Sequence, residues 1–303
     1  MIFTPLKPML LQTAPKVDLN KSEFIYEPKF DGFRLLLHKN GKQVEIFTRH
    51  GNCITEKLPE IVDAAKYMQF EKGILDGEGV VFRDGRTIFD DFSYRGRLSD
   101  PLKIKAASLS NPATFVAFDV ICKGDIAISE PLIKRKELLK ELITPSDRII
   151  TTPYFEGYGD QLYEWTKINE WEGIVYKHRD SKYTLDTRSN VWLKAKHWKQ
   201  LDVVILGYRL NPFALVVGAH FKSMRNKPIA VVEYGLSPEE KQAFLRIAKQ
   251  IHTAKDRNGI QWIEPHLCCR VQYLERTENH NLRIVTFKGF IFDKKPESCL
   301  WVS

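Results

Sequence analysis

The sequence predicts an α+β fold, with antiparallel sheets and flanking helices over residues 1–200 and a small β-barrel over residues 201–303. Runs of β-branched and aromatic residues separated by tight turns recur throughout the chain, which is typical of antiparallel strands. Amphipathic helical patterns interrupt these runs several times before residue 200 but only once after it. At 303 residues the chain is long enough for two domains, since domains average about 100–200 residues.

Composition limits the class of protein. Hydrophobic residues make up 43% of the chain, which excludes a largely disordered protein, and the net charge of +8 favours an acidic partner such as nucleic acid. The five cysteines are odd in number and form no C-x-x-C pair, so we expect reduced thiols and no zinc site. The sequence contains no signal peptide and no apolar run of about 20 residues, so we predict a cytoplasmic protein without membrane contact.

Seven strands are predicted before residue 200. They cover 24–29, 33–38, 43–48, 73–82, 114–121, 171–177 and 192–199. Asn40-Gly41 is a strong hairpin signal between the second and third strands, and Asp84-Gly85 ends the fourth with a turn. The first strand breaks at Asp31-Gly32, which places Lys29 beside a turn, where catalytic groups are commonly displayed.

Helices are predicted between these strands, at 59–70, 89–98, 134–143 and 158–170. Pro59 suits the first position of its helix, and the apolar residues that follow it form one stripe. The helix over 134–143 is amphipathic, with its leucines on one side.

The character of the chain changes near residue 200. Strands are predicted at short intervals, over 203–208, 215–221, 229–234, 271–275 and 285–292. One helix interrupts them, beginning at a capping box whose first residue is Ser237 and running to about residue 252. Short strands broken by one helix suit a small Greek-key barrel such as an OB-fold, so we place the domain boundary near residue 200.

Six short motifs follow one another in the first domain. They read E-P-K-F-D-G-F-R from Glu27, T-R-H-G from Thr48, L-D-G-E-G-V-V-F from Leu75, F-D-V from Phe118, E-G-I-V-Y-K from Glu172 and W-L-K-A-K from Trp192. Each one alone has an adequate structural explanation, since Lys29 could be a surface lysine and Phe118 a core aromatic. Their order and spacing resemble the collinear motifs of covalent nucleotidyltransferases, and most closely those of ATP-dependent DNA ligases.

Further segments resemble the ligase domain of bacterial non-homologous end-joining ligases. They include Asp91-Phe92, Arg95-Gly96-Arg97-Leu98, the run from Val271 to Leu274, and the ending from Asp293 to Cys299. The resemblance implies an adenylation domain followed by an OB-fold domain. It also implies a monomer that acts on nicked or broken double-stranded DNA, uses ATP with Mg²⁺ or Mn²⁺, and works with the end-binding protein Ku in one possible pathway.

The resemblance gives Lys29 the role of nucleophile, which takes AMP from ATP as a lysyl-AMP phosphoramidate. The AMP then passes to the 5′-phosphate of a nick, and the 3′-hydroxyl displaces it. Lys194 and Lys196 would bind the α-phosphate, and we expect their field to lower the pKa of Lys29. In a strand, the period of two places both lysines on one face.

The resemblance also implies roles for the other candidate residues. Phe118 stacks on adenine, Glu27 and its backbone read the base edge, Arg34 and Arg49 contact ribose, phosphate or the nick, and Arg188 is a further nucleotide-binding arginine. Arginine suits such positions because its planar fork pairs with phosphate oxygens. Metal would be held by Glu172, with Glu78 or Asp31 as further candidates. Glu78 could instead bind the ribose hydroxyl, and Asp31 could instead form the turn or pair with Lys29.

Two features modify this interpretation. Related ligases carry an arginine near the end of the barrel domain, where this chain has Ile291. We expect Lys288 or Lys294 to replace it, with Arg283 and Lys295 as further candidates. Lys29 lies near the start of the sequence and a four-cysteine zinc module is missing, so we expect ATP rather than NAD as the nucleotide.

The sequence leaves two alternatives to a DNA ligase open. An RNA ligase or a GTP-using capping enzyme shares the K-x-D-G chemistry, and an inactive relative could bind nucleic acid without reacting. The motif lysines and Glu172 argue against the inactive relative, whereas Ile291 is in its favour.

Overall fold

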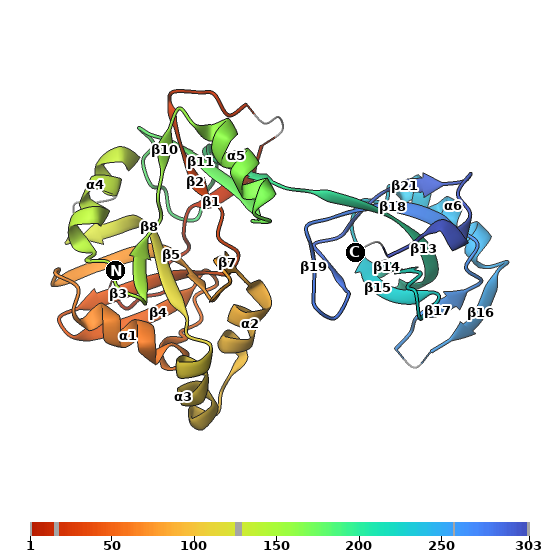
Figure 1. Cartoon of the computed structure of the whole chain (residues 1–303), viewed down its shortest axis with the longest axis horizontal. Coiled ribbons are helices and arrows are strands. Elements are labelled where there is room, and N and C mark those ends of the chain that lie inside the picture. The colour runs from red at the N-terminus through yellow and green to blue at the C-terminus, as the bar shows by residue number, and fades with distance from the viewer. Residues whose placement is uncertain (1, 15–17, 125–128, 257, 302–303) are drawn as a thin grey trace. The chain divides into compact units, whose positions relative to one another are not determined.

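The structure is a computed structural model that describes residues 2–14, 18–124, 129–256 and 258–301. It divides into two compact units, Met1–Lys196 and His197–Ser303 (Figure 1). Both strands and helices are present in each unit, so the predicted mixed α+β class is confirmed. None of the helices in the described ranges is long and apolar enough to cross a membrane.

Two five-stranded sheets form the framework of the first unit. One has the order β1 (Leu10–Thr13), β12 (Arg188–Lys196), β11 (Gly173–His178), β2 (Phe24–Pro28) and β10 (Phe155–Glu156). The other has the order β4 (Gln43–Thr48), β3 (Phe33–Asn40), β5 (Lys72–Val80), β8 (Thr114–Lys123) and β9 (Ile149–Thr151). Most pairings are antiparallel as predicted, but β1 runs parallel to β12 and β8 runs parallel to β9.

The turns that the sequence predicted are present. β3 and β4 pair as a hairpin up to Asn40 and Gln43, around the Asn40-Gly41 turn. The short strands β6 (Phe82–Arg83) and β7 (Arg86–Thr87) pair around Asp84 and Gly85, which both have positive φ. Both residue types tolerate that conformation, which explains the tight turn.

The segment after Lys29 does not form a hairpin, because β2 and β3 belong to different sheets. The chain crosses from one sheet to the other at Asp31-Gly32. A Cβ on Gly32 would lie 2.1 Å from the carbonyl oxygen of Gly79, so only glycine allows this close crossing. Lys29 is therefore presented at the crossing point between the two sheets.

Five α-helices accompany these sheets in the described part of the first unit. They are α1 (Pro59–Lys66), α2 (Phe89–Arg97), α3 (Pro101–Ser110), α4 (Leu132–Leu142) and α5 (Gly159–Ile168). α1 and α2 cover the second sheet, where Ile61 and Phe92 join a buried cluster with Leu35 and Leu75. α4 also packs on this sheet, since Leu139 belongs to the same cluster.

The second unit is built on a seven-stranded sheet. Its order is β15 (Lys227–Val232), β14 (Phe213–Ala219), β13 (Lys199–Leu210), β17 (Gln261–Ile263) and β16 (His252–Lys255), while β18 (Cys268–Tyr273) pairs with both β13 and β21 (Thr286–Ile291). β19 (Glu275–Arg276) and β20 (Leu282–Arg283) form a separate hairpin. An isolated bridge joins Tyr234 to Thr286, and the described pairings contain no ladder that closes the sheet, so the OB-fold barrel stays a prediction.

The helix of the second unit has the predicted start. α6 (Pro238–Ala248) begins with a capping box, in which the Glu240 N–H donates to Ser237 Oγ at 3.1 Å and the Ser237 N–H donates to Glu240 Oε2 at 2.8 Å. Phe244 and Ala248 bury its inner face in the core of this unit.

Candidate active site

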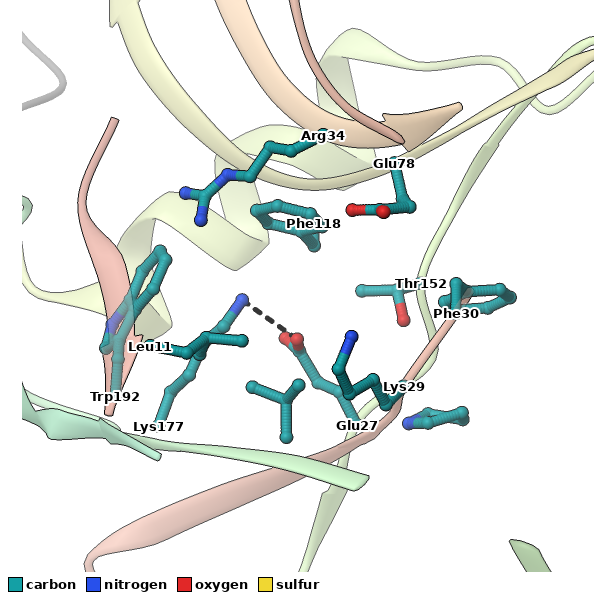
Figure 2. A pocket seen from close by; sticks show the side chains of 12 residues that line it. Leu11, Glu27, Lys29, Phe30, Arg34, Glu78, Phe118, Thr152, Lys177 and Trp192 are labelled. Carbon is teal, nitrogen blue, oxygen red and sulfur yellow. Dashed lines mark ion pairs between the residues drawn. The ribbon is translucent and has the colours of Figure 1, made fainter. Parts of the chain in front are cut away.

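A cavity in the first unit is lined from both of its sheets. Its lining includes the predicted site residues Glu27, Lys29, Arg34, Glu78 and Phe118. Figure 2 shows Arg34, Phe118 and Glu78 on one side of the cavity, with Glu27 and Lys29 on the other. These five residues come from separate motifs of the sequence, and the fold brings them together around one cavity.

Strand register explains why the basic residues gather on one face. One row across β2, β11 and β12 places Glu27 in line with Lys194, because both pair with the same residue of β11. In the next row the Lys29 N–H donates to the carbonyl oxygen of Gly173 at 2.9 Å, and Gly173 pairs with Lys196. Since strand side chains alternate between faces, all these side chains lie on the same side of the sheet.

Lys29 and Lys196 share one carboxylate. Lys29 Nζ lies 2.7 Å from Glu172 Oε2, and Lys196 Nζ lies 2.6 Å from Glu172 Oε1. The three side chains are 17%, 11% and 5% exposed for Lys29, Lys196 and Glu172, so the contacts are well shielded from water. The sequence separates Glu172 from Lys29 by more than a hundred positions, and the first sheet brings them into contact.

Gly173 makes this arrangement possible. Its φ is +142°, and a Cβ there would lie 2.1 Å from the carbonyl oxygen of Ala195 on β12. A side chain would therefore push β11 away from β12 and shift Glu172, its neighbour in sequence. Glycine is required at this position of the E-G motif for a steric reason.

The predicted effect on the pKa of Lys29 is wrong for this structure. Burial lowers that pKa, but Glu172, Glu78 and Asp31 together outweigh burial and raise the pKa above its ordinary value. The prediction considered the positive charge of Lys194 and Lys196 but not the carboxylates that act on the Lys29 ammonium. Lys29 is therefore held as an ammonium until the charge around it changes.

The neighbouring groups have shifted pKa values of their own. Burial lowers the pKa of Lys194 to about 8, with the cations Lys196, Lys29 and Arg188 adding to the effect. Burial by itself raises the pKa of Glu172, but Lys29 and Lys196 overcome this and hold it below its ordinary value. Glu172 thus stays ionised beside Lys29.

Glu78 differs from Glu172 in its protonation. Burial raises the pKa of Glu78 to about 7, although Lys29 and Arg34 act in the opposite direction. Glu78 lies opposite Arg34 in the register of β3 and β5.

The backbone N–H of Asp31 donates to Thr87 Oγ1 at 3.0 Å, which fixes the turn that follows Lys29.

The predicted metal ligands do not form a complete metal site by themselves. In the described parts of the chain, no three His, Cys, Asp or Glu side chains lie close enough together to hold a metal ion. Mg²⁺ in nucleotide sites is commonly bound through one or two carboxylates, with phosphate oxygens and water completing the shell. Glu172 and Glu78 fit that kind of site.

Arg34 is held by Asp76, a residue to which the sequence analysis assigns no role. Asp76 is fully buried and accepts Arg34 Nε at 2.9 Å and Nη2 at 2.5 Å, and it also accepts the hydroxyl of Tyr183 at 2.6 Å. The Arg34 guanidinium lies 5.0 Å from the ring centre of Phe118. Arg34 therefore forms part of the cavity wall, and its predicted contact with ribose or the nick stays a prediction.

Glu27 is also more constrained than predicted. Lys177 Nζ lies 2.8 Å from Glu27 Oε2, and Lys136 Nζ contacts Glu27 Oε1. Lys177 Nζ also lies 4.3 Å from the ring centres of both Phe118 and Trp192. Burial lowers the pKa of Lys177 to about 8 despite the charge of Glu27.

Sequence reasoning gave no role to several of these residues. The alternation of Gly173, Val175 and Lys177 on one strand could have placed Lys177 on the cavity face. The same alternation along the W-L-K-A-K motif could have placed Trp192 on the face of Lys194. No comparable signal marks Lys136 or Thr152, since their positions depend on how distant elements pack.

The two other predicted arginines are exposed and lie outside the described lining of the cavity. Arg49 Nε donates to His50 Nε2 at 3.0 Å. Arg188 Nη1 donates to the carbonyl oxygen of Leu11, a residue of the cavity wall. Their predicted contacts with nucleotide or DNA stay predictions.

The candidates for the missing arginine lie in the second unit. Lys294 Nζ pairs with Asp202 Oδ2 at 2.8 Å, Lys288 is exposed, and Arg283 pairs with Glu275. Ile291 packs against a small buried cluster that contains Cys268 and Cys299. An apolar residue suits that environment better than a charged one.

A family model of the ATP dependent DNA ligase domain matches residues 8–196. The bifunctional non-homologous end joining protein LigD of Bacillus subtilis is 33% identical over 319 residues, which cover 99% of this chain and 51% of that protein. The SPbeta prophage-derived DNA ligase-like protein LigB of the same organism is 29% identical and covers 94% of this chain and 98% of its own length. The chain thus spans about half the length of the LigD relative and nearly all of LigB.

Solved structures agree with this similarity. The ligase domain of Mycobacterium tuberculosis LigD is 27% identical, with a TM-score of 0.56, and covers 97% of this chain and 98% of that domain. A mycobacterial DNA ligase D complexed with ATP has a TM-score of 0.56 at 26% identity, over 97% of this chain and 98% of that one. A Lig E DNA ligase has a TM-score of 0.68 at 17% identity, over 94% of this chain and 98% of that one, which supports the fold alone.

Proposed function

The chain belongs to the family of ATP-dependent DNA ligase domains, and from this premise we propose that it seals nicks in duplex DNA through a covalent AMP on Lys29. The observation that carries the proposal is the shared contact of Lys29 and Lys196 with buried Glu172, at the edge of a cavity that contains the predicted adenine-binding residues. A lysine nucleophile needs a shielded site and nearby fixed charge, and both are present here.

In the first step the neutral Lys29 amine forms a bond to the α-phosphorus of ATP. The bond from that phosphorus to the bridging oxygen breaks, and pyrophosphate leaves with the electron pair. The nitrogen of Lys29 releases one proton to solvent as the phosphoramidate forms. Lys194 and Lys196 would stabilise the charge that develops on the α-phosphate oxygens. Burial of Lys29 already favours the neutral amine, so reducing the negative charge that faces it lowers its pKa toward the reactive form.

In the second step an oxygen of the DNA 5′-phosphate attacks the phosphorus of the bound AMP. The phosphorus–nitrogen bond breaks and its electron pair returns to Lys29. In the third step the 3′-hydroxyl attacks the activated 5′-phosphorus, AMP leaves, and a phosphodiester bond forms. We propose that Phe118 and Glu27 hold the adenine through these steps, and that Arg34, Arg49 and Arg188 contact ribose, phosphate or the nick.

We further propose that Glu172 holds Mg²⁺ or Mn²⁺, with Glu78 or Asp31 as the second carboxylate. When bound, the metal would neutralise phosphate charge. Its coordination by these carboxylates would also reduce the negative charge that faces Lys29. Glu78 could instead accept a ribose hydroxyl, a role that its pKa of about 7 also permits. None of the five cysteines, all of which lie in the described parts of the chain, forms a disulfide, and this supports the proposed cytoplasmic location.

The test is sealing of a nicked duplex with a labelled 5′-phosphate at the nick, in the presence of Mg²⁺. We expect the wild-type chain to seal nicked DNA with ATP and not with NAD, and Lys29→Ala to seal none. Lys66→Ala is the matched control, because Lys66 is an exposed lysine of the same unit that pairs with Asp63. Sealing by Lys29→Ala, or a preference for nicked RNA, would overturn the proposal.

The names of the LigD relatives motivate a second proposal, that the chain acts in non-homologous end joining with Ku. We expect a bacterial Ku to increase the joining of linear duplexes by this chain while leaving nick sealing unchanged. If end joining does not respond to Ku, the end-joining proposal fails and the nick-sealing proposal stands.

A further inference from the structure

Lys136 lies on α4, outside all six motifs, yet its ammonium reaches the carboxylate of Glu27. It contacts Glu27 Oε1 while Lys177 Nζ lies 2.8 Å from Oε2. Lys136 is 2% exposed, Glu27 is 3% exposed and Lys177 is 2% exposed, so all three side chains are buried. Figure 2 shows the Lys177–Glu27 ion pair inside the cavity, with Phe118 nearby. Lys136 itself does not belong to the described lining.

Two buried ammonium groups on one carboxylate are costly to assemble. One lysine would neutralise Glu27, and burying a second ammonium group beside the same carboxylate is unfavourable. The second lysine therefore calls for an explanation other than charge balance. What it adds is position, because each oxygen of the carboxylate now forms an ion pair with its own ammonium group.

α4 also holds the strand that carries Phe118. Arg135 precedes Lys136 in the helix, and it donates to Asp119 through Nε at 2.8 Å and through Nη2 at 3.0 Å. Asp119 is the residue after Phe118, and both members of this ion pair are fully buried. Consecutive residues of one helix thus contact Glu27 and the residue that follows Phe118.

A carboxylate fixed in this way discriminates between purines. An ionised carboxylate only accepts hydrogen bonds, and each oxygen of Glu27 keeps a lone pair after binding its lysine. A 6-aminopurine such as adenine offers an N–H donor to that acceptor. A 6-oxopurine such as hypoxanthine offers an oxygen, which the carboxylate repels, and leaving such buried polar groups unpaired gives strong discrimination.

We propose that Lys136 is a positioning residue that fixes the carboxylate of Glu27, and that it thereby makes the cavity select 6-aminopurine over 6-oxopurine nucleotides. The inference rests on the proposed function and deepens it, because it concerns the nucleotide that labels Lys29.

The test compares ATP with inosine triphosphate, which differs from ATP only at the 6-position and the adjacent ring nitrogen. Formation of the covalent nucleotide adduct is measured in the full chain for both substrates, and the ratio of their kcat/KM values is the readout. We expect Lys136→Met to reduce the wild-type preference for ATP about tenfold, which corresponds to the loss of about 1.4 kcal/mol of discrimination. Lys136→Arg should retain the preference, because a guanidinium keeps the charge and the donor.

Lys140→Met is the matched control. Lys140 lies one turn further along α4, and its ammonium is 4.8 Å from the ring centre of Tyr154, the ring that Lys136 approaches to 5.7 Å. Lys140 is exposed, so its removal should leave the ratio unchanged. Thermal unfolding of each variant distinguishes a loss of folding from a change in selectivity.

A double-mutant cycle tests the route through Glu27. If Lys136 acts by positioning Glu27, then Lys136→Met should add little to the change in ratio that Glu27→Gln causes alone. An unchanged ratio in Lys136→Met, an equal loss with both nucleotides, or additive effects in the cycle would each overturn the inference. Failure of the wild-type chain to form any adduct would instead overturn the proposed function.

Discussion

Asp76 is the buried carboxylate that keeps Arg34 in the wall of the cavity. Removing it would leave the guanidinium of Arg34 buried without its partner and the hydroxyl of Tyr183 without its acceptor. We expect Asp76→Ala to lower the free energy of unfolding by about 3 kcal/mol, measured by urea titration. Asp63→Ala removes an exposed i,i+3 partner of Lys66 and should cost less than about 0.5 kcal/mol. Equal effects of the two substitutions would contradict this account of Asp76.

Glu78 predicts a pH dependence of stability. Burial raises its pKa from 4.5 to about 7, so the folded chain binds a proton that the unfolded chain releases. The resulting stabilisation is fully present below pH 4.5 and is lost as the pH rises through about 7. Without divalent metal, Glu78→Gln should therefore match the wild type near pH 5 and exceed its free energy of unfolding at pH 8 by on the order of 2 kcal/mol.

The control for this prediction is Glu71→Gln, at an exposed carboxyl of the same unit. It should show the same pH dependence as the wild type. If Glu78→Gln also follows the wild type between pH 5 and 8, the carboxyl of Glu78 is not desolvated as the structure indicates.

Site residues that lie within a short sequence motif could be predicted, whereas those positioned only by tertiary packing could not. The motifs identified Lys29, Glu172 and Lys196 as chemically linked, and the structure brings these three into contact. The predicted direction for the pKa of Lys29 was wrong, because three carboxylates outweigh the effect of burial. Lys136 could not be predicted, since its contact with Glu27 depends on the packing of α4 against a distant strand.

At the scale of elements, the spacing of β11 and β12 depends on Gly173. Gly173→Ala should lower the free energy of unfolding by about 3 kcal/mol, because the new Cβ meets the backbone of Ala195 at a positive φ. It should also slow formation of the lysyl-AMP adduct, since the Lys29 N–H donates to Gly173 and Glu172 precedes it.

Gly157→Ala separates backbone strain from steric clash. Gly157 also has a positive φ, of +75°, but no atom lies within 4 Å of where its Cβ would be. We expect it to cost about 1 kcal/mol and to leave adduct formation unchanged. Comparable effects at the two glycines would argue against close strand approach as the reason for Gly173.

Elements with strong local signals were predicted, whereas pairing partners were not. The Asn40-Gly41 hairpin and the capping box of α6 were both found from the sequence and are confirmed. α3 was missed, although Asp100 caps it and Pro101 begins it. β16 was missed because all four of its residues are exposed and no alternation of apolar residues marks it.

The parallel pairing of β1 with β12 shows a different limit. Only an extended conformation was predicted for residues 1–22, because a short extended segment carries no information about the strand with which it will pair. β1 contributes Leu11 to the cavity wall. This part of the site could not be predicted without knowing that β1 pairs with β12.

At the scale of the whole molecule, the net charge of +8 predicts DNA binding that is strongly dependent on salt. If several lysine and arginine residues neutralise phosphates, the affinity for a nicked duplex should fall about 10²- to 10³-fold between 50 and 200 mM salt. Fluorescence anisotropy with Lys29→Ala would measure this without turnover. An affinity that changes less than about threefold over that range would contradict phosphate contacts as the main source of binding.

The relatives bear on the whole molecule as well. The chain covers 51% of the B. subtilis LigD protein but 98% of LigB, so its similarity extends to ligases with and without further segments. The alternatives of an RNA ligase, a capping enzyme or an inactive relative are not favoured by these matches.

The most direct test of the central claim is to locate the covalent AMP. The full chain is incubated with ATP and Mg²⁺, digested, and analysed by peptide mass spectrometry before and after addition of nicked DNA. The account predicts AMP on Lys29, its disappearance on addition of the nick, and the appearance of sealed duplex. AMP on another residue, or on Lys29 but not discharged by nicked DNA, would contradict it.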